Sequence, residues 1–356
     1  MSWPPAPTDP ALPVPDGLDA RGLQPRRIVV VQYGKLGDVL LCTPTVRALR
    51  QRYPDAVIHF VVSRSYRAAL AGNPDLDEVV VHTSNWQTLR AVRAGGYDLG
   101  IDLQGNGWSA ALLATAGVKV RVGRTSGRRR DRLLTHAVPA QRSYSAQFRA
   151  SVLRVLGIEE VCLDLVLELD EEVVARTAEA VAGLPGAGPV VALSPAAAFP
   201  TRAWPEARWI ELGRSLRERG MRPVVMWGPG EEDLASRIAA ASGAHRAPPT
   251  RIDELAGWLR ACRVHVGCCS GPRHLAVSQR TPTVTVMGAT PVGGWTRPTP
   301  WHRAVWTEMS CRPCNAKTCD IGVQCLADVG AQPVAEHVVA LADRGPEPPL
   351  VVRIRG

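Results

Sequence analysis

The sequence predicts an α/β protein made of two similar doubly wound domains, each with a parallel sheet that helices cover on both faces. Three observations predict this class. Short apolar, β-branched runs alternate with amphipathic segments of helical period. The alternation pauses at a Pro- and Gly-rich stretch, 184–189, and then starts again. The 356 residues also exceed what one hydrophobic core usually serves. A substrate is therefore expected in a central cleft between the two domains.

Each element follows from its local pattern. Apolar runs between turn residues predict strands, and apolar positions of period 3.6 predict helices. In the first half we expect strands at 28–32, 57–62, 78–82 and 99–103, with helices at 44–53, near 65–71 and at 86–94. In the second half we expect strands at 190–193, 222–227, 264–266 and 283–287, with helices at 205–219, 231–242, 252–260 and 271–279.

The domain boundaries follow from composition. Residues 1–25 are rich in proline and lack apolar periodicity, so we expect a disordered arm there. The first domain is predicted at 26–182 and the second at 189–342, followed by a tail, 343–356.

Composition limits the function classes. The net charge of +9 makes nucleic acid a natural candidate partner, but the chain has no zinc-finger spacing and only 5% aromatic residues, so we expect no nucleic-acid binding. No apolar run reaches about 18 uncharged residues, and prolines and acids occupy the start, where a signal peptide would be basic and apolar. We therefore expect a cytoplasmic protein with at most peripheral membrane contact.

The loop after the first strand carries the first candidate catalytic residue. It contains Gly34 and Gly37, which allow the backbone to approach a ligand closely, and then Asp38. Ligands of open α/β sheets bind at the carboxyl ends of the strands, so Asp38 is a candidate general base. The alternative is that its carboxylate only caps a helix.

Three loops of the second half follow predicted strands and offer polar groups. The first contains Ser194 and Arg202, and the second contains Glu231, which is placed where a ribose diol could be held. The third contains Ser270 and Gly271 and opens a helix, whose free backbone N–H groups favour an anion. Each loop alone is a weak signal, but their order and positions together indicate one site.

A set of short motifs then identifies a resemblance. In the first half these motifs lie at residues 37–39 with Thr43 and Pro44, and at 47–49, 97–98 and 102–106. In the second half they lie at residues 200–205, 228–231 and 270–276. Over residues 26 to 342 the chain resembles glycosyltransferase family 9, the heptosyltransferase-like group with the GT-B fold. The resemblance implies an inverting, metal-independent transfer of a sugar from a nucleotide diphosphate, commonly ADP-heptose, to a hydroxyl of a glycolipid or glycan, as in lipopolysaccharide biosynthesis.

The resemblance also implies roles for single residues. Asp38 takes the proton of the acceptor hydroxyl, while Arg202, the helix that begins at Ser270 and Gly271, and His274 stabilise the departing diphosphate. Arg202 stands where the family usually has lysine. The other donor-binding candidates are Ser194, Thr201, Glu231 and Cys269, and the acceptor-binding candidates are Lys35, Gly37, Asn106 and Arg124. Arg124 belongs to an arginine-rich stretch, 119–132, which is either a solvated loop or a docking surface for an anionic acceptor.

One position departs from the family pattern. An acidic residue usually precedes the Ser/Thr-Gly pair of the diphosphate loop, and here Cys269 stands there. A carboxylate accepts hydrogen bonds from sugar hydroxyls, whereas a thiol barely does. The departure indicates altered or relaxed donor choice, a tolerated substitution, or loss of activity.

Four cysteines, Cys311, Cys314, Cys319 and Cys325, lie within one short loop. Four thiolates suit a tetrahedral structural metal, zinc or iron, although the spacing is not that of a standard zinc ribbon. Reduced thiols without metal and disulfides are the alternatives, and a cytoplasmic location argues against disulfides. No cofactor is expected to be required for catalysis.

Two other classes of function compete with transfer. A sugar-nucleotide-binding protein without turnover would explain Cys269, but the chain keeps both Asp38 and Arg202. A nicotinamide oxidoreductase would need a G-x-G-x-x-G fingerprint, which the first loop lacks.

Overall fold

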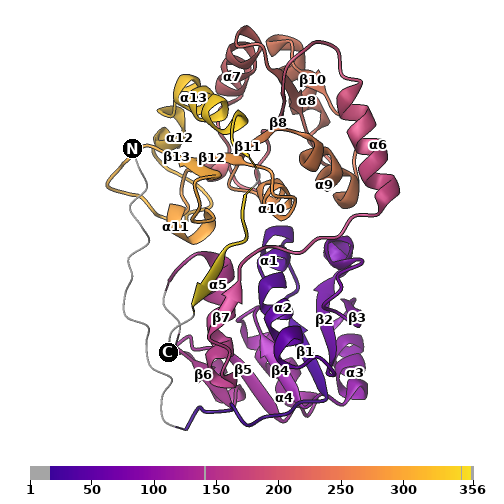
Figure 1. Ribbon diagram of the computed structural model, residues 1–356. Coiled ribbons are helices and arrows are strands. Elements are labelled where there is room, and N and C mark those ends of the chain that lie inside the picture. Colours follow the sequence, from indigo (N-terminus) through magenta and orange to yellow (C-terminus); the bar gives the residue numbers. More distant parts are fainter. Residues whose placement is uncertain (1–16, 140–141, 346, 354–356) are drawn as a thin grey trace. The chain divides into compact units, whose positions relative to one another are not determined.

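The computed structural model describes residues 17–139, 142–345 and 347–353 (Figure 1). It contains two six-stranded sheets, and every neighbouring pair of strands in them is parallel. The strand orders, β3-β2-β1-β4-β5-β6 and β10-β9-β8-β11-β12-β13, are the same doubly wound order repeated. The predicted fold class is confirmed.

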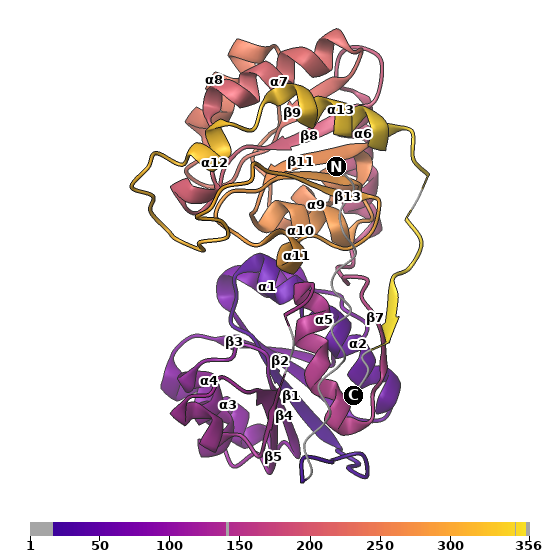
Figure 2. The same cartoon turned by 90° about the vertical axis from the view of Figure 1, so that its left-hand side faces the viewer.

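The first unit runs to Glu168 and also takes in the chain from Pro349 onwards. Helices α3 and α4 lie on one face of its sheet and α2 and α5 on the other (Figure 2). Its strands are β1 Arg27–Val31, β2 Val57–Ser63, β3 Glu78–His82, β4 Leu99–Asp102, β5 Val120–Arg124, β6 His136–Val138, β7 Glu160–Cys162 and β14 Val351–Arg353. Its helices are α1 Leu36–Leu40, α2 Thr43–Arg52, α3 Asn85–Gly95, α4 Gly107–Thr115 and α5 Ser145–Ala150.

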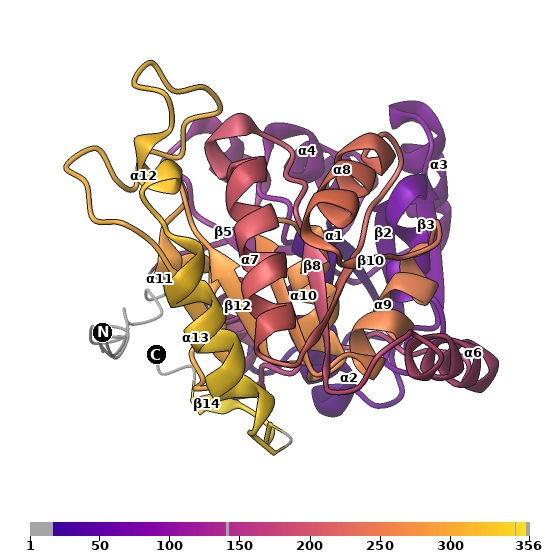
Figure 3. The same ribbon diagram turned by 90° about the horizontal axis from the view of Figure 1, so that it is seen from above.

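The second unit comprises Leu169–Pro348. Helices α7, α8 and α13 lie on one face of its sheet, and α9 and α10 lie on the other (Figures 2 and 3). Its strands are β8 Val190–Ser194, β9 Arg222–Val225, β10 His245–Arg246, β11 Val264–Cys268, β12 Thr283–Val286 and β13 His302–Val305. Its helices are α6 Glu171–Ala182, α7 Glu206–Glu218, α8 Glu232–Ser242, α9 Ile252–Ala261, α10 Gly271–Ser278, α11 Val292–Trp295, α12 Gln324–Ala327 and α13 Ala331–Ala342.

The boundary between the units differs from the expected one. The prediction assigned α6 to the first domain, but this helix packs on α9 of the second unit, where Arg176 pairs with Glu254 at 3.0 Å. The Pro- and Gly-rich stretch 184–189 is therefore a connection inside the second unit. Glycine is required there at Gly188, where φ is +92° and a Cβ would lie 2.0 Å from the Gly220 carbonyl oxygen.

Both ends of the chain differ in part from the expectation. The predicted tail contains β14, which pairs with β7 in antiparallel fashion. Most of the predicted N-terminal arm, residues 1–16, lies outside the described residues. From Gly17 on the chain contacts the first unit, and the Ala20 N–H donates to the Val155 carbonyl at 2.8 Å.

The loop after β1 is also partly helical. Gly34 adopts φ +136°, and a Cβ there would lie 2.2 Å from the Tyr66 ring, so only glycine fits. The chain then forms α1, a segment that the sequence pattern did not predict. The segment predicted as a helix near 65–71 is a 3₁₀ helix, Arg64–Leu70.

A buried polar cluster fixes the end of the second unit. The Glu347 carboxylate accepts from Arg297 Nε at 2.9 Å and from Thr299 Oγ1 at 2.5 Å, and it lies 2.8 Å from His302 Nε2. Burial alone would raise the pKa of Glu347, but the hydrogen bonds from His302 and Thr299 and the Arg297 charge outweigh it and lower the pKa to about 2.

This pKa predicts acid sensitivity. Because the folded pKa lies below the unfolded value of 4.5, the carboxylate stabilises the fold above pH 4.5, and this stabilisation is lost as pH falls towards 2. Glu347→Gln should cost about 1–3 kcal/mol of unfolding free energy at pH 7 and less at pH 3. Thermal unfolding of both proteins across this range measures the difference, and a gap that does not shrink on acidification contradicts the assignment.

Candidate functional site

Asp38 lies within α1, just beyond the carboxyl end of β1, and its side chain is partly exposed. Arg149 Nη2, from α5, lies 2.5 Å from Asp38 Oδ1. Asp38 Oδ2 accepts a long hydrogen bond, 3.4 Å, from the Lys35 backbone N–H. Asp38 therefore does cap α1 weakly, but its stronger contact is the ion pair with Arg149, and Oδ2 keeps capacity to accept a proton.

A second guanidinium lies near this ion pair. Arg124 stacks on the Phe148 ring, with Cζ 4.1 Å from the ring centre, and its buried Nε has no hydrogen-bond partner. Burial, followed by the positive charge of Arg149, lowers the pKa of Arg124 to about 10. Two guanidinium groups thus share the neighbourhood of Asp38, an arrangement that favours an anionic ligand.

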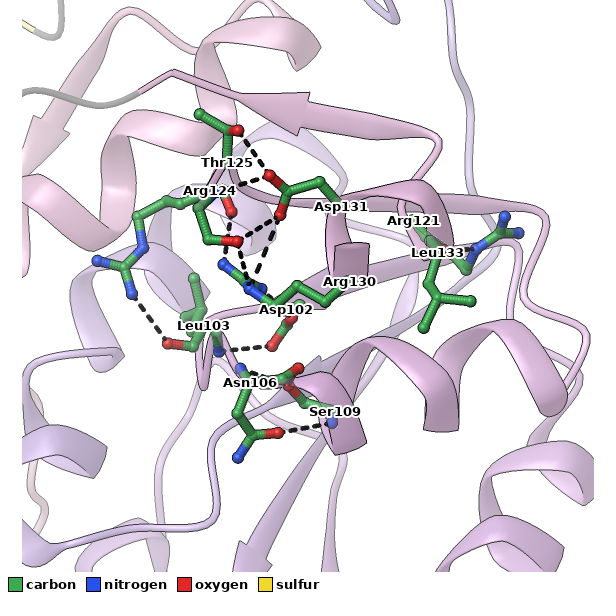
Figure 4. Close-up of polar contacts among 12 residues, drawn as sticks. Asp102, Leu103, Asn106, Ser109, Arg121, Arg124, Thr125, Arg130, Asp131 and Leu133 are labelled. Carbon is green, nitrogen blue, oxygen red and sulfur yellow. Dashed lines mark hydrogen bonds and ion pairs between the residues drawn. The ribbon is translucent and has the colours of Figure 1, made fainter. Parts of the chain in front are cut away.

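The end of β4 supports this region (Figure 4). Asp102 is fully buried, and its Oδ1 accepts from the Gly105 N–H at 2.9 Å while Arg130 Nη1 lies 3.4 Å from Oδ2. Asn106 caps α4, because its Oδ1 accepts from the Ser109 N–H at 2.8 Å. The amide oxygen of Asn106 is thus engaged, and only its NH₂ group is left for an acceptor.

Hydrogen bonds also organise the arginine-rich stretch. The Asp131 carboxylate accepts from Thr125 Oγ1, Ser126 N and Gly127 N, each at 2.8 Å (Figure 4). Burial raises the pKa of Asp131, but these bonds and that from Ser126 Oγ outweigh it and lower the pKa to about 2. The loop is thus ordered by an internal carboxylate. Its inward arginines, Arg121 and Arg130, bind backbone carbonyls, while Arg128, Arg129 and Arg132 are exposed.

The remaining acceptor candidates lie just before Asp38 in the sequence. Gly37 is buried inside α1, and Lys35 is exposed at its N-terminus. Among the described residues, then, the structure gathers Asp38 and the two guanidinium groups, whereas Asn106 acts mainly as a helix cap.

In the second unit, α10 begins directly after β11. Ser270 is its N-cap residue, and the Ser270 Oγ is buried without a hydrogen-bond partner among the residues that the structure describes. Gly271 is the first helical residue, Cys269 is buried, and His274 is buried one turn further on, with its ring 6.3 Å from that of Trp295. A buried, unsatisfied hydroxyl at a helix start is a feature that an anionic ligand would complete.

Two contacts link the loop after β8 to the end of β11, which precedes α10. The Trp204 N–H donates to Cys268 Sγ at 3.4 Å, and Cys268 Sγ lies 3.6 Å from the Pro195 carbonyl oxygen. The structure therefore brings together the predicted segments that contain Ser194, Arg202 and Ser270. Arg202 Nε is buried without a partner, which leaves this guanidinium able to bind an anion.

Thr201 and Glu231 are held by the chain itself. The Thr201 hydroxyl donates to the Ala316 carbonyl at 2.7 Å, so it supports the Arg202 turn instead of facing a ligand. Glu231 Oε2 accepts from the Gly228 N–H at 2.8 Å, which shapes the loop before α8.

Sequence reasoning missed one residue at this site. His265 is fully buried on β11, and its Nε2 lies 3.0 Å from Ser194 Oγ. Burial, followed by the Arg273 charge, lowers the pKa of His265 to about 3, so the imidazole is neutral. Its position inside an apolar strand gave no local signal of this contact.

The four cysteines of the loop 311–325 are free thiols, and Cys325 alone of the four is buried. In the part of the chain that the structure describes, no three His, Cys, Asp or Glu side chains are arranged to hold a metal ion. The geometry therefore does not support the expected zinc or iron site. Within the same described ranges, no helix has the length and apolar character needed to span a bilayer.

Two similar, doubly wound parallel sheets are the architecture of the GT-B fold class. The chain belongs to glycosyltransferase family 9 (heptosyltransferase), whose family profile matches residues 85–324. The expected resemblance is thus confirmed, and the protein is a glycosyltransferase enzyme.

Individual relatives agree with this assignment. The chain is 26% identical over 293 residues to lipopolysaccharide heptosyltransferase 3 of Escherichia coli K12, covering 76% of this chain and 83% of that one. A family 9 glycosyltransferase of Veillonella parvula superposes with a TM-score of 0.76 at 20% identity, covering 89% and 97% of the two chains. An E. coli heptosyltransferase with ADP-2-deoxy-2-fluoro heptose superposes with a TM-score of 0.67 at 20% identity, covering 88% and 99%.

Proposed function

We propose that this enzyme transfers a heptose-like sugar from a nucleoside diphosphate, with ADP as the nucleotide, to a hydroxyl of a glycolipid or glycan of the lipopolysaccharide type. The observation that carries the proposal is the buried, unsatisfied Ser270 hydroxyl at the start of α10, in the same unit as an Arg202 guanidinium whose buried Nε has no partner. Both groups fit a diphosphate. The relative with a bound ADP-heptose analogue supports the choice of donor.

The chemistry divides between the two units. The acceptor oxygen attacks the anomeric carbon while its proton passes to Asp38 Oδ2, the oxygen that Arg149 leaves available. The bond between the anomeric carbon and the phosphate oxygen breaks, and its electron pair leaves with the diphosphate. Arg202, Ser270 and the N-terminus of α10 stabilise that charge, and a single displacement inverts the anomeric centre.

Arg149 acts in this scheme as a positioning residue. It is almost fully buried, and Nη1 donates to the Ser145 carbonyl at 3.1 Å, so the guanidinium holds Asp38 Oδ1 in one place. The proposed acceptor contacts are Lys35, Gly37, the Asn106 amide and Arg124. No step of the scheme requires a metal ion, because the Arg202 guanidinium and the N-terminus of α10 supply positive charge for the departing diphosphate.

The direct test is an assay with purified protein, ADP-heptose and a deacylated lipopolysaccharide core as acceptor. ADP release that depends on the acceptor, together with a product heavier by one heptose, supports the proposal. Binding of ADP-heptose without transfer to any acceptor would favour the alternative, a sugar-nucleotide-binding protein, and would contradict the scheme.

Cys269 predicts the breadth of donor choice. A buried thiol replaces a carboxylate beside the diphosphate, so sugar hydroxyls lose a strong acceptor while the diphosphate keeps its contacts. We expect the natural protein to accept more than one nucleotide-linked sugar. Cys269→Asp should raise the preference for the heptose donor over the other sugar nucleotides by about tenfold. A panel of ADP-, GDP- and UDP-sugars with both proteins measures this, and strict ADP-heptose selectivity in both would show that the cysteine is neutral.

Metal binding by Cys311, Cys314, Cys319 and Cys325 stays a prediction that elemental analysis decides. Thiolates are ligands for zinc and iron, and a bound ion would be structural because four thiolates leave no open position. Protein purified without chelator should then carry about one ion per chain, and Cys314→Ser should lose it. A metal-free protein with four titratable thiols and unchanged thermal stability after chelator treatment contradicts the prediction.

A further inference from the structure

The cysteine-rich loop, residues 311–325, ends within α12 (Figure 3) and is bonded to the turn that carries Arg202. Three backbone segments form a closed set of hydrogen bonds. The Thr201 hydroxyl donates to Ala316 O at 2.7 Å, the Asn315 N–H donates to Ala289 O at 2.9 Å, and the Ala289 N–H donates to Thr201 O at 3.1 Å. The position of the Arg202 turn therefore depends on the loop.

The three segments also pack without room for adjustment. At Gly288 a Cβ would lie 2.4 Å from the Thr201 carbonyl oxygen, so the backbones approach as closely as glycine allows. Arg312, in the loop, donates from Nε to Gly288 O at 2.8 Å and from Nη1 to Thr307 O at 2.7 Å. Cys325 and Leu326 are buried in the hydrophobic core, which anchors the far end of the loop.

The loop also places a second positive charge near Arg202. Phe199 has Arg202 Cζ at 5.1 Å and Lys317 Nζ at 5.4 Å from its ring centre. Among the described residues, neither cation has a carboxylate partner within salt-bridge distance. Both cations thus lie against the same ring with no carboxylate of the described chain to neutralise them, which leaves each charge available to an anion that binds beside Phe199.

We propose that the cysteine-rich loop is part of the donor site: it holds the Arg202 turn in place and supplies Lys317 as a second cation for the diphosphate of the nucleotide sugar. The proposal rests on the proposed function for the identity of the ligand. It gives the loop a role in donor binding whatever the state of its cysteines.

The first test measures the Kd of ADP by calorimetry at two salt concentrations. Lys317→Ala should raise the Kd about five- to tenfold and reduce its salt dependence, and Lys317→Arg should restore most of the affinity. Arg260→Ala, which removes an exposed positive charge of α9 in the same unit, is the matched control. If Lys317→Ala binds ADP as the natural protein does while Arg202→Ala binds weakly, Lys317 is not a donor contact.

The second test needs no ligand. Thr201→Val keeps the side-chain shape but removes the hydroxyl that bonds Ala316, so hydrogen exchange should accelerate about tenfold at the Ala289 and Asn315 amides. Thr115→Val removes a similar bond, to the Ala111 carbonyl in the first unit, and should leave these amides unchanged. Unchanged exchange in Thr201→Val would overturn the supporting role of the loop. A natural protein that binds no ADP or nucleotide sugar would overturn the proposed function instead, and the exchange result would still stand.

Discussion

Replacing Asp38 by Asn is expected to lower the turnover about a hundredfold or more while the Kd of ADP changes less than about twofold. The amide keeps the shape of the side chain, and its oxygen can still accept from Arg149, so the local geometry is retained. What is lost is the oxygen that takes the proton of the acceptor hydroxyl. Donor binding depends on groups of the second unit, so it should not change.

The measurement is the initial rate of ADP release together with ADP titration on the same preparation. Asp55→Asn, at an exposed aspartate of the same unit, controls for the loss of one negative charge. A near-normal rate in Asp38→Asn would remove this residue from catalysis. A parallel loss of rate and ADP affinity would indicate a structural role instead.

The order of strands and helices was predictable because it depends on local patterns. The apolar runs at 28–32, 57–62 and 190–193 each lie within two residues of the observed bounds of β1, β2 and β8. The candidates Asp38, Arg202 and Ser270 lie in the segments that follow β1, β8 and β11, so the same patterns located the segments that carry them. Local periodicity therefore located the ends of the strands, where the site lies.

The contacts that define the site were not predictable, because each joins residues far apart in the chain. Arg149 reaches Asp38 across 111 residues, Ala316 binds Thr201 across 115, and His265 binds Ser194 across 71. No period or spacing encodes such pairs. Residues 311–323 of the cysteine-rich loop form no helix or strand, so no sequence pattern predicts their hydrogen bonds to the Arg202 turn.

The predicted boundary between the two units, after residue 182, was wrong for a related reason. Pro and Gly mark a change of direction, but they do not show which sheet the preceding helix covers. Contacts between α6 and α9, such as Thr177 against Gly257, decide that the helix belongs to the second unit.

Arg202→Ala should weaken the binding of ADP and of the sugar nucleotide alike, by about 1.5–3 kcal/mol, or roughly ten- to a hundredfold in Kd. The guanidinium is half-buried, and its Nε has no hydrogen-bond partner within the described part of the chain. Its stacking contact is with Phe199, so a diphosphate would gain a charge-assisted bond that water does not fully replace. Arg202→Lys should retain most of the affinity, because a lysine ammonium still presents a positive charge to the phosphates.

Calorimetry with ADP and ADP-heptose measures the change, with Arg214→Ala on the exposed face of α7 as the matched control. If only the apparent affinity for the acceptor changed, Arg202 would belong to the acceptor side of the reaction and the division of roles between the two units would be wrong.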